Sequence, residues 1–208
     1  MNYGFVASKI DGSEQEFNEF KDFDIPKEYS YKKFLPDVIN QGQKPICVPC
    51  SVSAYINWNK NLSDGDNHRD NKVDLMQIFN NRTNESNDGM SFKDAFYFLR
   101  HEGVKTESGI YKINRYAKIP SELALKQALI MNGPCVGGLL VYDDRKWQFW
   151  KKNDYSEFQG GHAISIVGYN DKGFIIRNSW GKNFGESGYV LLEYDDFNYF
   201  TEIWTIIE

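Results

Sequence analysis

Residues 177–192 read RNSWGKNFGESGYVLL, and they carry the strongest structural signal in the chain. Their glycine-rich centre lies between two runs of β-branched and aromatic residues, GFIIRNSW at 173–180 and GYVLLEY at 188–194. Such runs, bounded by Gly, Asn and Asp, are typical of β-strands joined by turns. The segment therefore predicts two neighbouring strands over 173–180 and 188–194, with a polar residue, Asn178, inside the first.

The regions around this segment predict the rest of the fold. Similar β-branched or aromatic runs follow Pro134, at 135–142, 162–169 and 201–207. Before Pro134, apolar residues recur at steps of three and four, as in amphipathic helices. Four helices are expected there, from Cys47, around 73–80, from Ser91 and over 121–131. Helices first and strands second predict an α+β fold with two segregated parts.

Composition sets the class of protein. The chain has 208 residues, enough for one sizeable core or for two lobes that share a cleft. Apolar residues make up 41% and charged residues 25%, and the net charge is −5, with Lys and Arg scattered. We therefore expect no nucleic-acid partner and no anionic membrane surface. No apolar run reaches the 18 residues of a membrane span.

The cysteines and the first residues bear on location. Cys47, Cys50 and Cys135 are an odd number, and two of them share one CxxC, which is not a disulfide framework. The opening residues lack the basic and apolar regions of a secretory signal. A reducing compartment is therefore favoured, and we expect an intracellular or virion-associated protein rather than a secreted one.

Three residues have the chemistry of nucleophilic acyl transfer. Cys47 lies in NQGQKPICVPCS (40–51), His162 in GGHAISIVGYN (160–170), and Asn178 in the segment quoted first. A thiol, an imidazole and an amide that orients the imidazole are the parts that this reaction needs. The start of a helix at Cys47 would favour its thiolate. Of the three histidines, His68 and His101 lie in polar contexts, so His162 is the candidate base.

These three contexts, in this order, resemble the papain/cathepsin family of cysteine peptidases. The glycines and Tyr189 in WGKNFGESGY follow the family's pattern, and the similarity covers about 26–194. The resemblance implies a papain-like fold, with the active-site cleft between a helical lobe at about 40–115 and a β-rich lobe at about 116–208. Residues 1–24 would be an N-terminal extension before a peptidase domain at 25–208.

The resemblance also implies a role for each candidate residue. Cys47 would be the nucleophile, His162 the general acid and base, and Asn178 the residue that orients His162. Gln41, six residues before Cys47, would donate to the oxyanion together with the backbone N–H of Cys47. Substrate contacts would come from a backbone stretch, two pocket residues and a shielding indole, namely Gly89, Met90, Gly138, Ala163 and Trp180.

These assignments imply a peptidase of protein or peptide substrates. No metal and no organic cofactor is needed. We expect a monomer, and an endopeptidase, because no inserted loop would obviously block one end of the cleft. Residues 1–24 are too short for the long inhibitory propeptide of secreted family members, so how activity is restrained stays open.

The chain departs from the family pattern around the nucleophile. Lys44 stands where a disulfide cysteine is common, Val48 replaces a tryptophan, and Pro49 replaces a small residue. These differences predict a distant, disulfide-free branch of bacterial or viral type.

Three other functions stay open. The motif from Cys47 to Cys50 also fits a thiol-disulfide oxidoreductase, although no convincing strand precedes it. The same triad could serve an acyl-transferase or a deamidase. An inactive binding module on this fold is the third.

Overall fold

The computed structural model describes residues 3–64, 73–83, 89–143 and 145–208. Its α-helices are α1 (Cys47–Asp64), α2 (Leu75–Asn80), α3 (Phe92–His101) and α4 (Glu122–Asn132). Its strands are β1 (Tyr29–Ser30), β2 (Val104–Thr106), β3 (Gly109–Tyr111), β4 (Arg115–Lys118), β5 (Cys135–Val141), β6 (Gly160–Tyr169), β7 (Gly173–Arg177), β8 (Tyr189–Glu193) and β9 (Phe200–Ile207). Two 3₁₀ helices complete the elements, η1 (Lys32–Phe34) and η2 (Tyr194–Tyr199).

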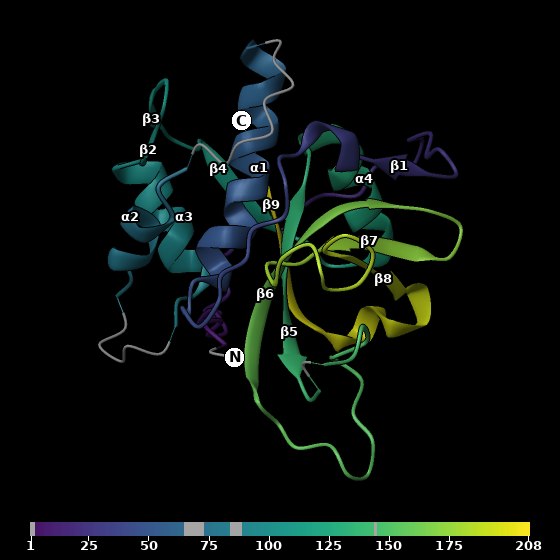
Figure 1. Cartoon of the computed structure of the whole chain (residues 1–208). Helices are drawn as coiled ribbons and strands as arrows, with labels where there is room; N and C mark the ends of the chain where they lie inside the picture. Colours follow the sequence, from purple (N-terminus) through teal and green to yellow (C-terminus); the bar gives the residue numbers. More distant parts are fainter. Residues whose placement is uncertain (1–2, 65–72, 84–88, 144) are drawn as a thin grey trace.

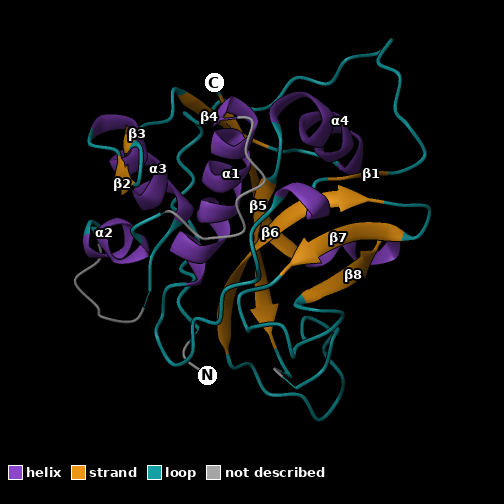
Figure 2. Cartoon of the chain, turned by 45° about the horizontal axis from the view of Figure 1, so that its top comes forward, coloured by secondary structure: helices purple, strands orange, loops and turns teal. Residues whose placement is uncertain are grey.

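One antiparallel sheet forms the β-rich part of the molecule. Its strands lie in the order β4-β9-β5-β6-β7-β8, and β1 pairs with β6 outside this path. Helices α2 and α3 and the β2–β3 hairpin lie on one side of α1, and the sheet lies on the other (Figures 1 and 2). The expected α+β architecture is therefore confirmed. The strands before Pro134, β1 to β4, are short and were not predicted.

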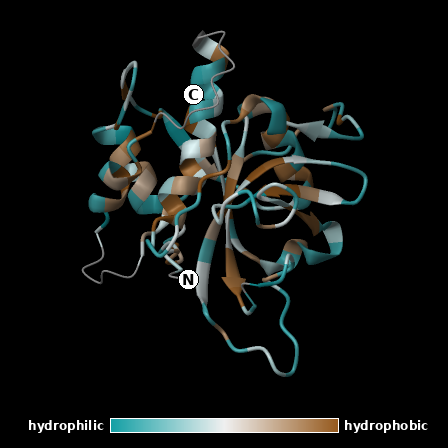
Figure 3. Ribbon diagram, in the orientation of Figure 1, coloured by the Kyte–Doolittle hydropathy of each residue, from teal (hydrophilic) through white to brown (hydrophobic). Residues whose placement is uncertain are grey.

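Two apolar clusters hold these parts together. The first contains buried residues of α1, α2 and α3 and reaches across to the sheet through Val136, Val167 and Trp204. The second lies between the sheet and α4 and contains Leu125, Ile164 and Trp180. Hydrophobic colouring follows β5, whereas the loop from β5 to β6 is mostly hydrophilic (Figure 3). Because α1 contributes to the first cluster and packs on β6, its first turn is fixed against the sheet.

Residues 3–24, expected as an extension, pack against both parts of the molecule. Phe5 forms an isolated parallel bridge with Met90 and belongs to the first cluster. Glu16 forms a second bridge with Lys118 of β4, and the neighbouring Phe17 belongs to the second cluster. This segment is thus part of the packed structure over its described length.

Local signals explain several element boundaries. The helix α1 begins at Cys47 as expected, and Ser91 caps α3 in a capping box with Asp94. The strand predicted over 173–180 ends earlier, at Arg177. Asn178 N–H still donates to Gly188 O (3.0 Å), but pairing stops there because Gly188 N–H donates to Phe184 O (2.7 Å) and returns no bond to Asn178. None of the helices in the described ranges has the length and apolarity needed to cross a membrane.

Candidate active site

Three elements bring the predicted triad residues together. Cys47 is the first residue of α1, His162 is the third residue of β6, and Asn178 directly follows β7. The strands β6 and β7 are neighbours, and Ser165 pairs with Arg177, so Asn178 lies one step beyond that pair, beside β6. Because α1 packs on β6, the sheet brings the imidazole and the amide to the end of the helix that carries the thiol.

A hydrogen bond of 2.7 Å joins His162 Nε2 to Asn178 Oδ1. An amide oxygen only accepts, so Nε2 carries the hydrogen, and a neutral ring then has its acceptor at Nδ1. Within the described part of the chain, His162 Nδ1 is buried and has no hydrogen-bond partner. The bond to Asn178 therefore selects the tautomer that leaves Nδ1 able to take a proton.

Aromatic side chains enclose this pair. The Trp180 ring stacks on the His162 ring, with centroids 4.7 Å apart, and Phe149 lies 5.7 Å from the same ring. Phe184 packs edge-on against Trp180 at 4.7 Å. Burial lowers the pKa of His162 to about 4, and the hydrogen bond with Asn178 opposes this shift only in part. The imidazole is therefore neutral at pH 7 in this structure.

The thiol of Cys47 is also buried. Burial raises its pKa to about 11, although the nearby backbone N–H groups of Ala163 and Gly4 oppose this shift in part. The sequence predicts a thiol that the helix start favours as thiolate. The structure differs, because the loss of solvation outweighs the nearby N–H donors. Thiol and imidazole are thus both uncharged here.

Gln41 is tied to the segment that carries Asn178. Its Oε1 accepts from Ser179 Oγ (2.5 Å), and its backbone N–H donates to Ser179 O (2.9 Å). Its Nε2 donates to Lys44 O (2.9 Å). The loop before α1 and the turn after β7 are therefore joined at the residue predicted to stabilise the oxyanion.

Gly89, Met90 and Gly138, three of the five predicted substrate contacts, border a segment that the sequence assignment left out, Gly4 to Val6. Met90 N–H donates to Gly4 O (2.8 Å), and Val6 N–H donates to Met90 O (3.0 Å). Phe5 lies directly over Gly138 of β5, and Gly161 of the neighbouring strand β6 accepts from the N–H of Phe5. Gly160 and Gly161 leave room for an approaching backbone. This pair of glycines is the signal in the sequence that could have indicated the neighbouring segment.

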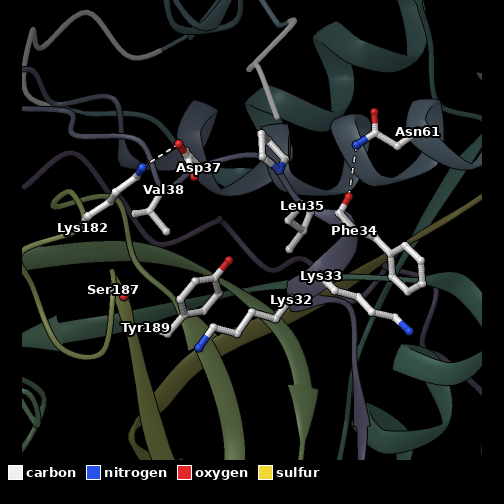
Figure 4. Close-up of a pocket in the computed structure, with 11 residues that line it drawn as sticks. Lys32, Lys33, Phe34, Leu35, Asp37, Val38, Asn61, Lys182, Ser187 and Tyr189 are labelled. Carbon is white, nitrogen blue, oxygen red and sulfur yellow. Dashed lines mark hydrogen bonds and ion pairs between the residues drawn. The ribbon is translucent and has the colours of Figure 1, made fainter. Parts of the chain in front are cut away.

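An open pocket lies elsewhere on the surface. Its volume is about 670 Å³, and its lining comes from η1, the loop after it, α1 and the turn between β7 and β8 (Figure 4). Lys182 forms an ion pair with Asp37 there (2.6 Å), and Asn61 donates to Phe34 O. Cys47, His162 and Asn178 do not line it. This pocket and the residues with catalytic chemistry are therefore separate, and the chemistry identifies the site.

We see no candidate metal site in the part of the chain that the structure describes. Among the described ranges, no three His, Cys, Asp or Glu side chains are grouped to hold a metal ion. Cys47, Cys50 and Cys135 are free thiols, and all three are buried.

Comparison with known proteins gives a consistent family. The model of the papain family of cysteine proteases matches residues 76–202, which include His162 and Asn178 and begin after Cys47. Cathepsin B-like CP3 of Giardia intestinalis is 37% identical over 203 residues, which cover 80% of this chain and 67% of that protein. Zingipain-2 of Zingiber officinale is 31% identical over 120 residues, 52% of this chain. The chain spans 53% of zingipain-2, and about a third of similar proteins from a mimivirus and an iridescent virus (31% and 33%).

Solved structures share the fold. Xylellain, a cysteine protease from Xylella fastidiosa, superposes with a TM-score of 0.83 over 99% of this chain and 95% of its own, at 22% identity. Procathepsin B S9 from Trypanosoma congolense has a TM-score of 0.76 over 99% of this chain and 86% of its own, at 15% identity. At these identities the likeness concerns the fold.

Proposed function

This chain belongs to the papain family of cysteine proteases, and we propose that it hydrolyses peptide bonds in protein or peptide substrates through an acyl-thioester intermediate. The observation that carries the proposal is the 2.7 Å bond between His162 Nε2 and Asn178 Oδ1. It leaves Nδ1 as a proton acceptor without a partner among the described residues. The sulfur of Cys47 lies nearby, against the N–H of Ala163, which is next to His162 in the chain.

In the first step, Cys47 Sγ attacks the carbonyl carbon of the scissile bond, and the thiol proton passes to His162 Nδ1. A bond forms between sulfur and carbon, and the carbonyl electron pair moves to oxygen. Asn178 keeps the ring oriented and stabilises the imidazolium that forms, because its Oδ1 accepts from Nε2. General-base assistance of this kind contributes roughly 10²- to 10⁴-fold in rate.

The negative oxygen of the tetrahedral intermediate needs fixed donors. We assign this role to the side-chain amide of Gln41 and to the backbone N–H of Cys47. Support comes from the hydrogen bonds that hold Gln41 to Ser179 and Lys44, since a donor that is already oriented costs no reorganisation during the reaction.

The intermediate then collapses. The carbon–nitrogen bond breaks, and His162 Nδ1 returns its proton to the leaving amine, which leaves a thioester on Cys47. A water molecule next gives a proton to His162 and attacks the thioester carbon. The carbon–sulfur bond breaks, His162 Nδ1 returns this proton to the sulfur to restore the thiol of Cys47, and the carboxylic acid product leaves.

The remaining assignments concern the setting of the reaction. We propose a monomer, because every member of the site comes from one chain, and an endopeptidase. The net charge of −5 argues against nucleic acid or an anionic membrane as a partner. Three free cysteines favour a reducing environment, so we propose an intracellular or virion-associated enzyme.

The redox function is not favoured, because the family and the relatives are proteases. A peptidase and an oxidoreductase also depend differently on Cys50. A peptidase needs only Cys47, whereas a thiol-disulfide oxidoreductase needs both sulfurs.

A peptide mixture incubated with the protein, followed by mass spectrometry of the products, tests the proposal. We expect hydrolysis by the wild type and by Cys50→Ala, and none by Cys47→Ala. A trapped acyl group should map to Cys47. Hydrolysis that survives Cys47→Ala, or that is lost with Cys50→Ala, would contradict the proposal. Transfer of the acyl group to an added amine in preference to water would identify an acyl-transferase instead.

A further inference from the structure

A second thiol follows the proposed nucleophile by three residues on the same helix. Cys47 is the first residue of α1, and Cys50 belongs to the first turn of that helix. Both are free thiols, and both are buried in the first apolar cluster. The hydrolysis proposed above uses only the sulfur of Cys47, so it assigns no role to Cys50.

Helix geometry holds the two residues at a separation that suits a disulfide. Cys50 N–H donates to Ile46 O (3.0 Å), so the backbone from Ile46 to Cys50 forms a regular α-helical turn. In such a turn, residues three apart lie on one face, with Cα atoms about 5 Å apart. Disulfides join residues whose Cα atoms are roughly 4.4 to 6.8 Å apart. The two cysteines therefore meet the backbone condition for a disulfide.

The end position of Cys47 gives its side chain a freedom that an interior helical residue lacks. Inside a helix, the χ1 rotamer near +60° clashes with the preceding turn. No helical turn precedes Cys47, because α1 begins there. Pro49 fits this first turn, since the first backbone N–H groups of a helix have no intrahelical partner. The sulfur of Cys47 can thus turn toward Cys50, and the closing movement is confined to the helix end.

The surroundings of Cys50 include a fixed positive charge. Arg177 is buried, and its guanidinium donates to Tyr189 OH (2.8 Å) and to Asp37 O (2.9 Å). Burial raises the pKa of Cys50 most, and a negative charge on Cys47 raises it further. The guanidinium of Arg177 lowers this pKa in part. The two sulfurs are therefore close enough for the charge of one to affect the other.

Oxidation of Cys47 changes this balance in favour of a reaction at Cys50. A sulfenic acid at Cys47 replaces the thiolate by an uncharged –SOH group. The charge that raises the pKa of Cys50 is then lost, whereas Arg177 still lowers it. Cys50 consequently ionises more readily after the first oxidation of Cys47 than before it. A thiolate is the form that attacks an oxidised sulfur.

The third cysteine lies outside this pair. Cys135 begins β5 and belongs to the second apolar cluster, which contains neither Cys47 nor Cys50. Its sulfur donates to Gly133 O (3.7 Å). Of the three thiols in the chain, Cys50 is thus the partner for an oxidised Cys47, and Cys135 provides an internal control.

We propose that Cys50 is a resolving cysteine, which converts a peroxide-oxidised Cys47 into a Cys47–Cys50 disulfide that stops hydrolysis and that small thiols reverse. This inference rests on the proposed peptidase function for access to Cys47, whose side chain is 0% exposed here. A site that admits a peptide to this sulfur also admits a hydroperoxide, because the hydroperoxide is much smaller.

The oxidation takes place in two steps. The sulfur of Cys47 attacks one peroxide oxygen, the O–O bond breaks, and the displaced hydroxide and the thiol proton form water. Cys50 Sγ then attacks Cys47 Sγ, the S–O bond breaks, and the oxygen leaves as a second water with the proton of Cys50. One peroxide is thereby reduced to two waters, and two thiols are oxidised to one disulfide. Without Cys50, further peroxide converts the sulfenic acid to sulfinic and sulfonic acids, which thiols do not reduce.

The test treats the reduced full chain at pH 7 with hydrogen peroxide and follows the peptide that contains both cysteines by mass spectrometry. In the wild type this peptide should lose two hydrogen atoms, and dithiothreitol should restore them. In Cys50→Ala it should instead gain two or three oxygen atoms, which dithiothreitol does not remove. The peptide hydrolysis recovered with dithiothreitol should be roughly 10-fold higher, or more, in the wild type than in Cys50→Ala.

Two further variants make the test specific. Cys135→Ala removes a buried thiol from the other cluster, and it should form the disulfide as the wild type does. Cys50→Val keeps more of the buried apolar volume than Cys50→Ala does, and it should be oxidised irreversibly in the same way. Circular dichroism and thermal unfolding of each variant before treatment show whether the oxidation is that of a folded protein.

The outcomes separate this inference from the proposed function. Irreversible oxidation of Cys47 to the same extent in the wild type, Cys50→Ala and Cys50→Val, all folded, would overturn the resolving role even if the wild type hydrolyses peptides. A Cys47 that stays reduced in peroxide that oxidises free cysteine would overturn it as well. A reversible disulfide in a protein that hydrolyses no peptide before treatment would support the disulfide chemistry and refute the peptidase function. A reversible disulfide that abolishes measured hydrolysis supports both.

Discussion

The two sides of the active site are built in different ways. On the sheet side, neighbouring strands hold His162 and Asn178, and their 2.7 Å bond lies under the ring of Trp180. On the helical side, Cys47 begins α1. Its sulfur lies close to the backbone N–H of Gly4, a residue far from Cys47 in the sequence. Strand pairing and side-chain packing therefore fix the sheet side. The protonation state of Cys47, in contrast, depends on the residues that bury its sulfur.

This difference means that the orientation of the imidazole and the reactivity of the thiol have separate causes. The orientation of the imidazole follows from the β6–β7 pairing and from the turn that places Asn178. The pKa of Cys47, in contrast, is raised mainly by burial. Exposure of the thiol to solvent should thus change its reactivity while the bond between His162 and Asn178 stays in place.

The largest expected effect is on the helical side. Cys47→Ala should lower kcat/KM for peptide hydrolysis by roughly 10⁴-fold or more, because the sulfur that forms the acyl bond is gone. Steady-state kinetics on one fluorogenic peptide measures this loss. Cys135→Ala is the matched control, since that thiol is equally buried but lies at the start of β5 and contacts Gly133 O. Comparable losses in both variants would mean that packing, and not nucleophilic chemistry, is responsible.

The second effect tests whether the sheet side acts by orientation. Asn178→Ala should lower kcat by roughly 10²- to 10³-fold with little change in KM, because Nε2 loses its acceptor and the ring is no longer held in one tautomer. Asn178→Asp keeps an acceptor oxygen for both Nε2 and the Ser179 N–H, and it should retain more activity. If Asp and Ala lower kcat equally, the hydrogen bond does not position the base.

The third effect is a pH dependence of the free energy of unfolding, which follows from the burial of His162. Burial lowers the pKa of His162 from 6.5 to about 4, so the unfolded chain binds a proton in this range that the native ring does not. The contribution of this difference to the free energy of unfolding is complete above pH 6.5, and it is lost as the pH falls toward 4. Between pH 7 and 5 it amounts to about 2 kcal/mol.

Urea unfolding of the wild type and of His162→Gln at pH 7 and pH 5 isolates this contribution. The groups that face the ring are Tyr3, Phe149, Asn178 and Trp180, and His162→Gln leaves all of them in place. The wild type should lose more free energy of unfolding than the variant over this interval. An equal loss in both proteins would show that the ring titrates as in water.

The sequence was informative where local chemistry dictates structure. The helix start at Cys47, the capping box of Ser91 with Asp94, and the strands after Pro134 follow from short-range patterns. The turn after Trp180 is rich in glycine for a physical reason, since Gly181, Gly185 and Gly188 all have positive φ. Short strands such as β4 were missed because only their pairing partners, here β9, stabilise them.

The burial of Cys47 and His162 could not be predicted from local patterns. Residues 3–6 are separated from Met90 and Gly161 by long stretches of chain, and their pairing with them depends on the completed fold. The same holds for the thiol, whose burial outweighs the favourable helix start that the sequence indicates. Both features depend on the tertiary structure, and rules based on residue spacing do not predict them.

The smallest expected effect concerns the neighbour of the nucleophile on α1. Cys50 is a buried thiol one turn after Cys47, and desolvation raises its pKa further than that of Cys47. As a small apolar side chain, it should tolerate replacement. Cys50→Val should change kcat/KM less than about threefold and stability by less than about 1.5 kcal/mol, measured by peptide hydrolysis and urea unfolding. Loss of activity in Cys50→Val, with stability unchanged, would mean that the second thiol takes part in the chemistry and that the helical side carries a redox pair instead of a single nucleophile.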